Sequence, residues 1–161
     1  MICTLVIAVA LHAEAQADVT FHGFSWGTSL QTFTARMGNP AYVEEINGLR
    51  SLVYDNIEVS GYQVFLIAYF SQSGLEGGTY YFVDTYSNEE RIQCYTNMRR
   101  ELLERYGSTN LNDTLFREMA PYESSWDLPS GYVHLKVDTR RNDPVTLWFS
   151  SPALTRILFG S

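Results

Sequence analysis

Residues 87–107 have the sequence SNEERIQCYTNMRRELLERYG and contain the clearest helix signal in the chain. Ser87 and Glu90 form an S-x-x-E capping box, in which each side chain accepts a hydrogen bond from the other residue's backbone N–H. Acidic residues stand at the start of the segment and arginines towards its end, an order that suits the helix dipole. Gly107 predicts the C-terminal end. One apolar stripe at helical spacing predicts the buried side: Ile92, Tyr95, Met98, Leu102 and Tyr106.

Three strand-like runs precede this helix and three follow it. The preceding runs are residues 49–59, 62–71 and 79–86, and the following runs are residues 122–128, 132–139 and 145–151. Aromatic and β-branched residues are frequent in them, and Gly, Pro and Ser separate them. Because the links are short, antiparallel pairing is expected.

An apolar stretch and a glycine-rich stretch each add a detail to this predicted order of strands. Residues 62–71 are apolar on both alternating faces at Val64 to Ile67, which predicts a central strand covered on both sides. Gly74, Gly77 and Gly78 predict a hairpin loop before the third run.

A shorter helix is expected over residues 28–37, where Thr28 or Ser29 can cap its start and Gly38 can end it. Residues 108–113 are expected to form a loop, residues 115–119 a helical turn, and residues 153–159 a short helical tail. The order is therefore helix, three strands, helix, three strands. We predict an α+β fold: one antiparallel sheet of about six strands with two helices on one face, arranged as two α-β-β-β halves.

The first 17 residues predict an export signal. Residues 2–11, ICTLVIAVAL, are uniformly apolar but shorter than the about 20 residues of a membrane-spanning helix. The A-x-A sequence Ala15-Gln16-Ala17 follows, as at a signal-peptide cleavage site. We expect a signal peptide over 1–17, a single domain over 18–161, and export to the periplasm or secretion; the alternative is a buried first strand or helix. Cleavage would leave Cys94 as the one thiol, and its helical, apolar surroundings predict burial.

The charge balance excludes two classes of partner. The chain has 18 acidic residues against 11 Lys and Arg, and its formal net charge is −7. Nucleic-acid binding requires clustered basic residues, whereas the longest basic cluster here is two residues, so no nucleic-acid partner is expected. The same charge argues against an anionic membrane surface. No integral membrane span is expected either.

The stretch Trp26-Gly27-Thr28-Ser29, then Phe33, then Met37-Gly38-Asn39-Pro40, resembles a bacterial envelope pattern. It is similar to the helix start of SmpA/OmlA (BamE-like) outer-membrane assembly proteins and of the β-lactamase-inhibitor-protein-like fold. In that pattern a Gly-x-Ser/Thr cap opens a short helix that ends at a Gly-x-Pro turn. The resemblance implies a protein-binding module of the envelope, and it supplies no catalytic residues.

No catalytic, cofactor or metal site is expected. His22 and His134 follow the leader, and the chain lacks the H-x-H, H-E-x-x-H and C-x-x-C spacings of metal sites. It also lacks the G-x-S-x-G elbow of many hydrolases. The adjacent pairs Glu44-Glu45 and Glu89-Glu90 do not place two carboxyl groups around one bond, as a glycosidase requires. A hydrolase would need one of the histidines beside a carboxylate and a nucleophile.

Four aromatic residues are the candidate interaction residues: Tyr80, Tyr86, Trp126 and Trp148. They fall on predicted strands whose alternation would expose some of them, and Tyr and Trp bury large areas at little entropic cost. The alternative is that they fill the core. We therefore expect a non-enzymatic binding protein of the envelope or periplasm, whose open sheet face holds another envelope or secreted protein. The alternative function is small-ligand binding in an apolar pocket between sheet and helices.

Overall fold

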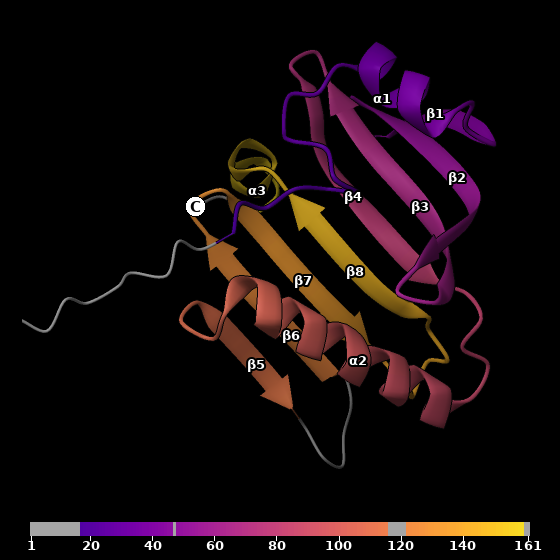
Figure 1. The fold of residues 1–161 in the computed structure, drawn as a ribbon, viewed down its shortest axis with the longest axis vertical. Helices are drawn as coiled ribbons and strands as arrows, with labels where there is room; N and C mark the ends of the chain where they lie inside the picture. Colours follow the sequence, from indigo (N-terminus) through magenta and orange to yellow (C-terminus); the bar gives the residue numbers. More distant parts are fainter. Residues whose placement is uncertain (1–16, 47, 116–121, 160–161) are drawn as a thin grey trace, which may run out of the picture.

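Eight antiparallel strands form one sheet in the order β1-β2-β3-β4-β8-β7-β6-β5 (Figure 1). The computed structural model describes residues 17–46, 48–115 and 122–159. The helices are α1 (Leu30–Met37), α2 (Asn88–Tyr106) and α3 (Pro152–Phe159). The strands are β1 (Tyr42–Ile46), β2 (Leu49–Val59), β3 (Tyr62–Ser71), β4 (Gly74–Phe82), β5 (Leu111–Leu115), β6 (Tyr122–Leu128), β7 (Gly131–Val137) and β8 (Val145–Ser150). The predicted α+β class with one antiparallel sheet is confirmed, and so is the helical tail, whereas the prediction of about six strands was wrong.

The chain consists of two halves with the same order of elements. Each half has a helix followed by four strands, α1 with β1–β4 and α2 with β5–β8, instead of the predicted three. The last strands of the two halves pair at the centre of the sheet, where Thr79 of β4 lies opposite Trp148 of β8. The strand order is consequently symmetric about the β4–β8 pair.

The sheet has one face under α1 and α2, which we call the covered face, and an opposite open face. On the covered face, Phe33 of α1 packs against the rings of Tyr54 and Phe70. In the second half, the Tyr95 hydroxyl of α2 lies 2.6 Å from the Ser124 hydroxyl of β6. In Figure 1, α2 crosses in front of the strands while α3 is fainter and lies behind them. The two predicted helices therefore share one face, and the third lies on the other.

Glycines 77 and 78 explain how both layers reach β4. A Cβ on Gly78 would lie 2.1 Å from the Phe21 ring, and a Cβ on Gly77 would lie 2.7 Å from Leu154 of α3. Successive residues of a strand point to opposite faces, so Phe21 and α3 approach the backbone from opposite sides. The glycines predicted to form a loop belong to β4 because they permit this close packing.

Both helices that cover the sheet begin with the expected side-chain caps. The Ser29 hydroxyl accepts the N–H of Thr32 at the start of α1. At the start of α2, both reciprocal bonds of the Ser87–Glu90 capping box are present, which satisfies two backbone N–H groups that have no partner within the helix. Gly107 ends α2 with a positive φ of 71°, and its N–H donates to the carbonyl of Leu103.

The two outer strands are the ones that the sequence pattern missed. Residues 111–113 were expected to form a loop, but β5 extends over residues 111–115 and pairs with β6. The expected helical turn was wrong at residue 115, and its residues 116–119 lie outside the described residues. In β1 all five residues are exposed, so the strand has no buried alternation to recognise. Edge strands with polar or inward-pointing charged residues are a common protection against aggregation.

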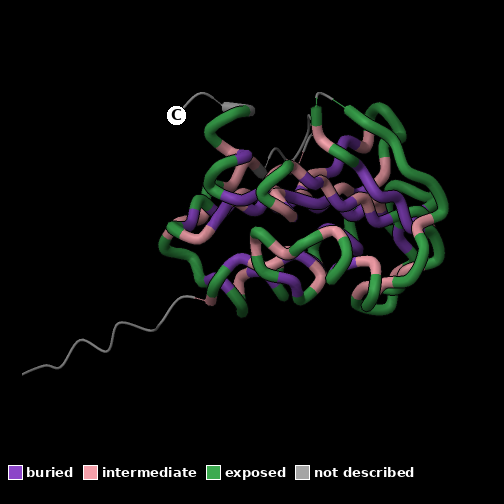
Figure 2. The backbone as a smooth tube through the Cα atoms, turned by 90° about the horizontal axis from the view of Figure 1, so that it is seen from above, coloured by how far each residue is buried: buried purple, intermediate pink, exposed green. Residues whose placement is uncertain are grey.

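The hydrophobic core lies between the covered face and the segments packed on it. It extends through both halves, from Phe33 under α1 to Trp126 and Leu135 under α2. Figure 2 shows the buried stretches inside the molecule and the exposed stretches around them. Cys94 is buried in this core, as predicted. One continuous core makes the two halves a single packing unit.

Candidate functional site

The four candidate interaction residues lie in different places. Trp126 is fully buried on the covered face, where its Nε1 donates to the carbonyl of Gly107 at 2.9 Å. Tyr80 is also on that face and only 5% exposed. Tyr86 lies beyond the end of β4, in the loop before α2, and is 80% exposed. Trp148 lies on the open face, stacked on Tyr69. Of the four, Trp148 alone belongs to the open face.

The open face of β1–β4 is apolar and aromatic. Tyr42 of β1 and Phe65 of β3 are 56% and 45% exposed. A hollow of about 250 Å³ lies among residues of four strands and of the segment before β1: Ala41, Tyr42, Val53, Asp55, Phe65, Ile67 and Tyr81. The prediction that residues 62–71 are covered on both sides was wrong, because the helix on this face, α3, packs against β4, β7 and β8.

Only acidic charges accompany this apolar surface. Glu44 lies between Tyr42 and Ile46 on the same side of β1, Asp55 lines the hollow, and Glu58 lies opposite Gln63. None of the described open-face positions of β1–β4 carries Lys or Arg. The surface therefore combines apolar contact area with negative charge.

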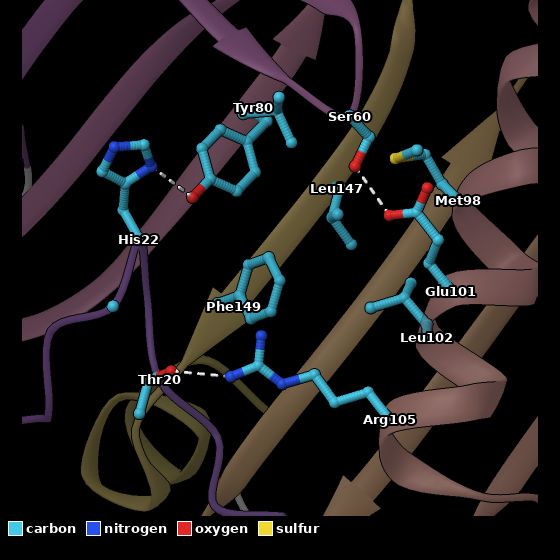
Figure 3. A pocket seen from close by; sticks show the side chains of 12 residues that line it. Thr20, His22, Ser60, Tyr80, Met98, Glu101, Leu102, Arg105, Leu147 and Phe149 are labelled. Atoms are coloured by element: carbon cyan, nitrogen blue, oxygen red, sulfur yellow. Dashed lines mark hydrogen bonds between the residues drawn. The ribbon is translucent and has the colours of Figure 1, made fainter.

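A second concave site, which we call the α2 pocket, lies on the covered face (Figure 3). It has a volume of about 250 Å³ and lies between α2, residues 20–23, the turn after β2, and strands β4 and β8. Met98 and Leu102 of α2 and Leu147 and Phe149 of β8 provide its apolar lining. The alternative function placed a small-ligand pocket in this position, between sheet and helices.

Three polar contacts surround the α2 pocket. The Ser60 hydroxyl donates to Glu101 Oε2 at 2.6 Å, and Arg105 Nη2 donates to the Thr20 hydroxyl at 2.9 Å. The Tyr80 hydroxyl lies 3.1 Å from Nδ1 of His22. In Figure 3, Glu101 and Arg105 extend from α2 towards different walls.

The His22–Tyr80 pair is electrically neutral near neutral pH. Burial lowers the pKa of His22, and the positive charge of Arg36 lowers it further. Burial also raises the pKa of Tyr80, so its hydroxyl stays protonated. His22 has a φ of 51° in the tight turn between Phe21 and Phe24, a left-handed conformation that few non-glycine residues adopt. That turn holds the imidazole ring beside the pocket.

On the covered face, a chain of hydrogen bonds connects the edge strand β5 to α2 through β6. The Tyr95 and Ser124 hydroxyls are bonded, Ser124 donates to Asp113 Oδ1 at 2.5 Å, and Asp113 forms an ion pair with Arg99. Burial opposes ionisation of Asp113, but the bonds from Arg99 and Ser124 outweigh it and lower the pKa. The sequence signal available for this network was the acidic residue at the end of the polar stretch 108–113.

Ser125 of β6 lies directly opposite His134 of β7 in the sheet, but no hydrogen bond joins the two side chains in the described part of the chain. His134 Nε2 is 3.8 Å from Glu123 on the open face, and burial lowers its pKa despite that carboxylate. Within residues 17–46, 48–115 and 122–159, neither His22 nor His134 hydrogen-bonds to a Ser, Thr or Cys side chain. Among these residues there is also no cluster of three or more His, Cys, Asp or Glu that could hold a metal ion. No helix among them has the length and apolar character needed to cross a membrane.

Comparisons with known proteins give distant structural similarity only. No family matches the sequence, and no curated protein matches it. A DUF4309 family protein from Bacillus subtilis matches at 12% identity over 83% of this chain and 87% of that chain, with a TM-score of 0.49. A cysteine-rich secretory protein from Staphylococcus aureus matches at 7% identity over 79% of this chain and 44% of that one, with a TM-score of 0.45. An extracellular protein containing an SCP domain from Bacillus anthracis matches at 8% identity over 88% of this chain and 50% of that one, with a TM-score of 0.44. None of these three is described as BamE-like or as a β-lactamase-inhibitor protein, and that resemblance stays a prediction.

Proposed function

We propose that this chain is an exported, non-enzymatic binding protein of the bacterial envelope or periplasm. Its partner is another envelope or secreted protein, which docks on the open face of β1–β4. One observation carries the proposal: Tyr42, Phe65 and their apolar neighbours form an exposed surface around a hollow, while the opposite face of β2 and β3 is packed under α1. Contiguous exposed apolar surface of this kind is typical of interaction sites.

The charges on the face specify the chemistry of the partner. Glu44, Asp55 and Glu58 are the acidic residues of this surface, and its described positions include no base. A complementary partner therefore presents Lys or Arg beside aromatic or aliphatic side chains. The apolar contacts supply most of the affinity, and the charges supply orientation and association rate.

Export is supported by the sequence of the first 17 residues. The apolar run at residues 2–11 and the Ala15-Gln16-Ala17 site have the form of a cleavable secretory signal. The α2 pocket favours a second role, small-ligand binding, at a site separate from the open face.

A capture experiment with matched variants tests the proposal. The full gene is expressed in a bacterial host, the exported protein is recovered from the periplasm or medium, and mass spectrometry identifies its N-terminus. The baits are the wild type, a Tyr42→Ala, Phe65→Ala double variant, and Tyr86→Ala, which removes an exposed aromatic away from the open face. A captured protein is then purified and titrated against each bait by calorimetry at low and high salt.

We expect cleavage after Ala17 and a partner that binds the wild type and Tyr86→Ala alike. The double variant should weaken binding at least tenfold, and added salt should weaken it further because the acidic rim is screened. Retention in the cytoplasm would overturn the export part. Equal binding by all three baits, or no direct binding by the wild type, would overturn docking on this face.

A further inference from the structure

The two charged residues at the α2 pocket, Glu101 and Arg105, do not form the ion pair that their spacing along the helix would favour. Glu101 and Arg105 are separated by one helical turn in the order that favours an ion pair along a helix. In the described part of the chain they do not pair with each other: Glu101 accepts from Ser60, while Arg105 donates to Thr20 on the opposite wall (Figure 3). The pocket therefore presents a negative and a positive group held apart.

The space between these charges is apolar. Met98 and Leu102 line it from α2, and Leu147 and Phe149 line it from the sheet. Each of these four residues is buried and no more than 6% exposed, so they form a dry wall of the pocket. A ligand that fits these surroundings carries a positive group for Glu101, a negative group for Arg105, and an apolar group for the wall between them.

We propose that the α2 pocket binds a free α-amino acid with an apolar side chain. Arg105 binds the α-carboxylate, Glu101 binds the α-ammonium, and the side chain packs on Leu147 and Phe149. A guanidinium has five N–H donors, and the bond to Thr20 occupies one of them. Likewise, Ser60 occupies one carboxylate oxygen of Glu101. Thr20 and Ser60 position the two charged groups without using up their capacity.

The size and the remaining wall of the pocket agree with a single amino acid. Its volume of about 250 Å³ is below the roughly 300–1,000 Å³ of pockets for drug-sized molecules. His22 and Tyr80 close one side as a neutral hydrogen-bonded pair, so they add no further charge to the site. The positive charge of Arg36 lies near His22, on the outer side of the turn that contains Gly23.

Isothermal titration of the exported protein with L-leucine tests this inference. Three analogues each lack one feature: leucinamide lacks the carboxylate, N-acetyl-leucine lacks the ammonium, and glycine lacks the apolar side chain. The variants Arg105→Gln and Glu101→Gln remove the charges of the pocket. Arg100→Gln and Glu104→Gln are matched controls, because both are exposed on α2 and neither lines the pocket. Circular dichroism verifies that each variant is folded.

We expect L-leucine to bind the wild type and both controls with one site. Each analogue should bind the wild type at least tenfold more weakly than L-leucine does, and each pocket variant should bind L-leucine at least tenfold more weakly than the wild type does. In each case one charge-assisted bond or the apolar contact is lost. No binding of leucine, methionine or phenylalanine to the wild type would overturn the proposal. Equal binding of N-acetyl-leucine would also overturn it, in favour of a site for simple anions. The inference is independent of docking on the open face, and Tyr42→Ala, Phe65→Ala should bind leucine normally.

Discussion

At the scale of single residues, Asp113 holds the outer edge of the second half. It accepts hydrogen bonds from Arg99 of α2 and Ser124 of β6, and so connects β5 to both. Asp113→Asn should lower the free energy of unfolding by about 2 kcal/mol, the contribution typical of hydrogen bonds to a charged group. Chemical denaturation measures this change. Asp127→Asn, an exposed carboxylate on neighbouring β6, should change it little.

The same residue predicts a pH dependence. The folded-state pKa of Asp113 is lowered below its unfolded value of about 3.9, so the carboxylate contributes its full stability above that pH. The contribution is lost as the pH falls through the folded-state pKa. The stability difference between wild type and Asp113→Asn should therefore shrink below about pH 4. A difference that stays constant to lower pH would contradict this role.

Cys94 is expected to be chemically inert in the folded protein. Burial raises its pKa to about 12, and the negative charges of Asp84 and Glu101 contribute. Because the thiolate is the reactive species, iodoacetamide should leave Cys94 unmodified at pH 8 and modify it fully in denaturant, as measured by peptide mapping. Ser108→Cys, at an exposed position, should react in the native state. Native labelling of Cys94 at a comparable rate would show that the core opens readily.

The candidate residues could be predicted from sequence only in part, because alternation shows that two faces exist but not which one a helix covers. Residues 62–71 are apolar on both faces, and nothing local distinguishes Phe65, which is exposed, from Leu66, which is buried. Tryptophan is a common anchor residue at interaction sites, yet Trp126 lies in the core. Glu101 and Arg105 have the spacing of an ordinary helix ion pair, so the α2 pocket had no sequence signal of its own.

At the scale of elements, α2 depends on its N-terminal cap. Ser87 and Glu90 satisfy each other's backbone N–H groups, and Glu90 Oε2 also accepts from the N–H of Tyr86. Ser87→Ala should reduce the free energy of unfolding by about 1 kcal/mol, as measured by urea denaturation. Ser108→Ala, an exposed serine just beyond the other end of α2, is the matched control. An equal loss from both would show that the cap contributes nothing particular.

The elements that sequence predicted well are those with local determinants. The caps and the stripe at helical spacing specified α2, and the turn residues separated the central strands. β1 and β5 had no such determinants, since an edge strand needs neither a buried face nor an apolar composition. The prediction of a loop at Gly77 and Gly78 was wrong for a related reason. These glycines allow close packing against Phe21 and Leu154, which are distant in sequence.

At the scale of the whole molecule, the two halves should unfold together. They share one sheet through β4 and β8, and one core from Phe33 to Leu135. Far-ultraviolet circular dichroism and tryptophan fluorescence should therefore report one coincident thermal transition. Trp26 precedes α1 and its Nε1 donates to the carbonyl of Ser130 after β6, so its fluorescence reports the contact between the two halves, while Trp126 of β6 reports the second half. Two separated transitions would mean that the halves are independent domains.

The central position of the β4–β8 pair also matters while the protein is being made. A chain that emerges N-terminus first completes β4 at Phe82 long before β8 begins at Val145, and β4 then has an unpaired edge in the middle of the future sheet. Its glycine-rich backbone and the tyrosines that follow are open to pairing with a neighbouring chain during that interval. Newly made chains would depend on a chaperone during that interval, and crowded overproduction would favour strand-exchanged dimers joined through β4.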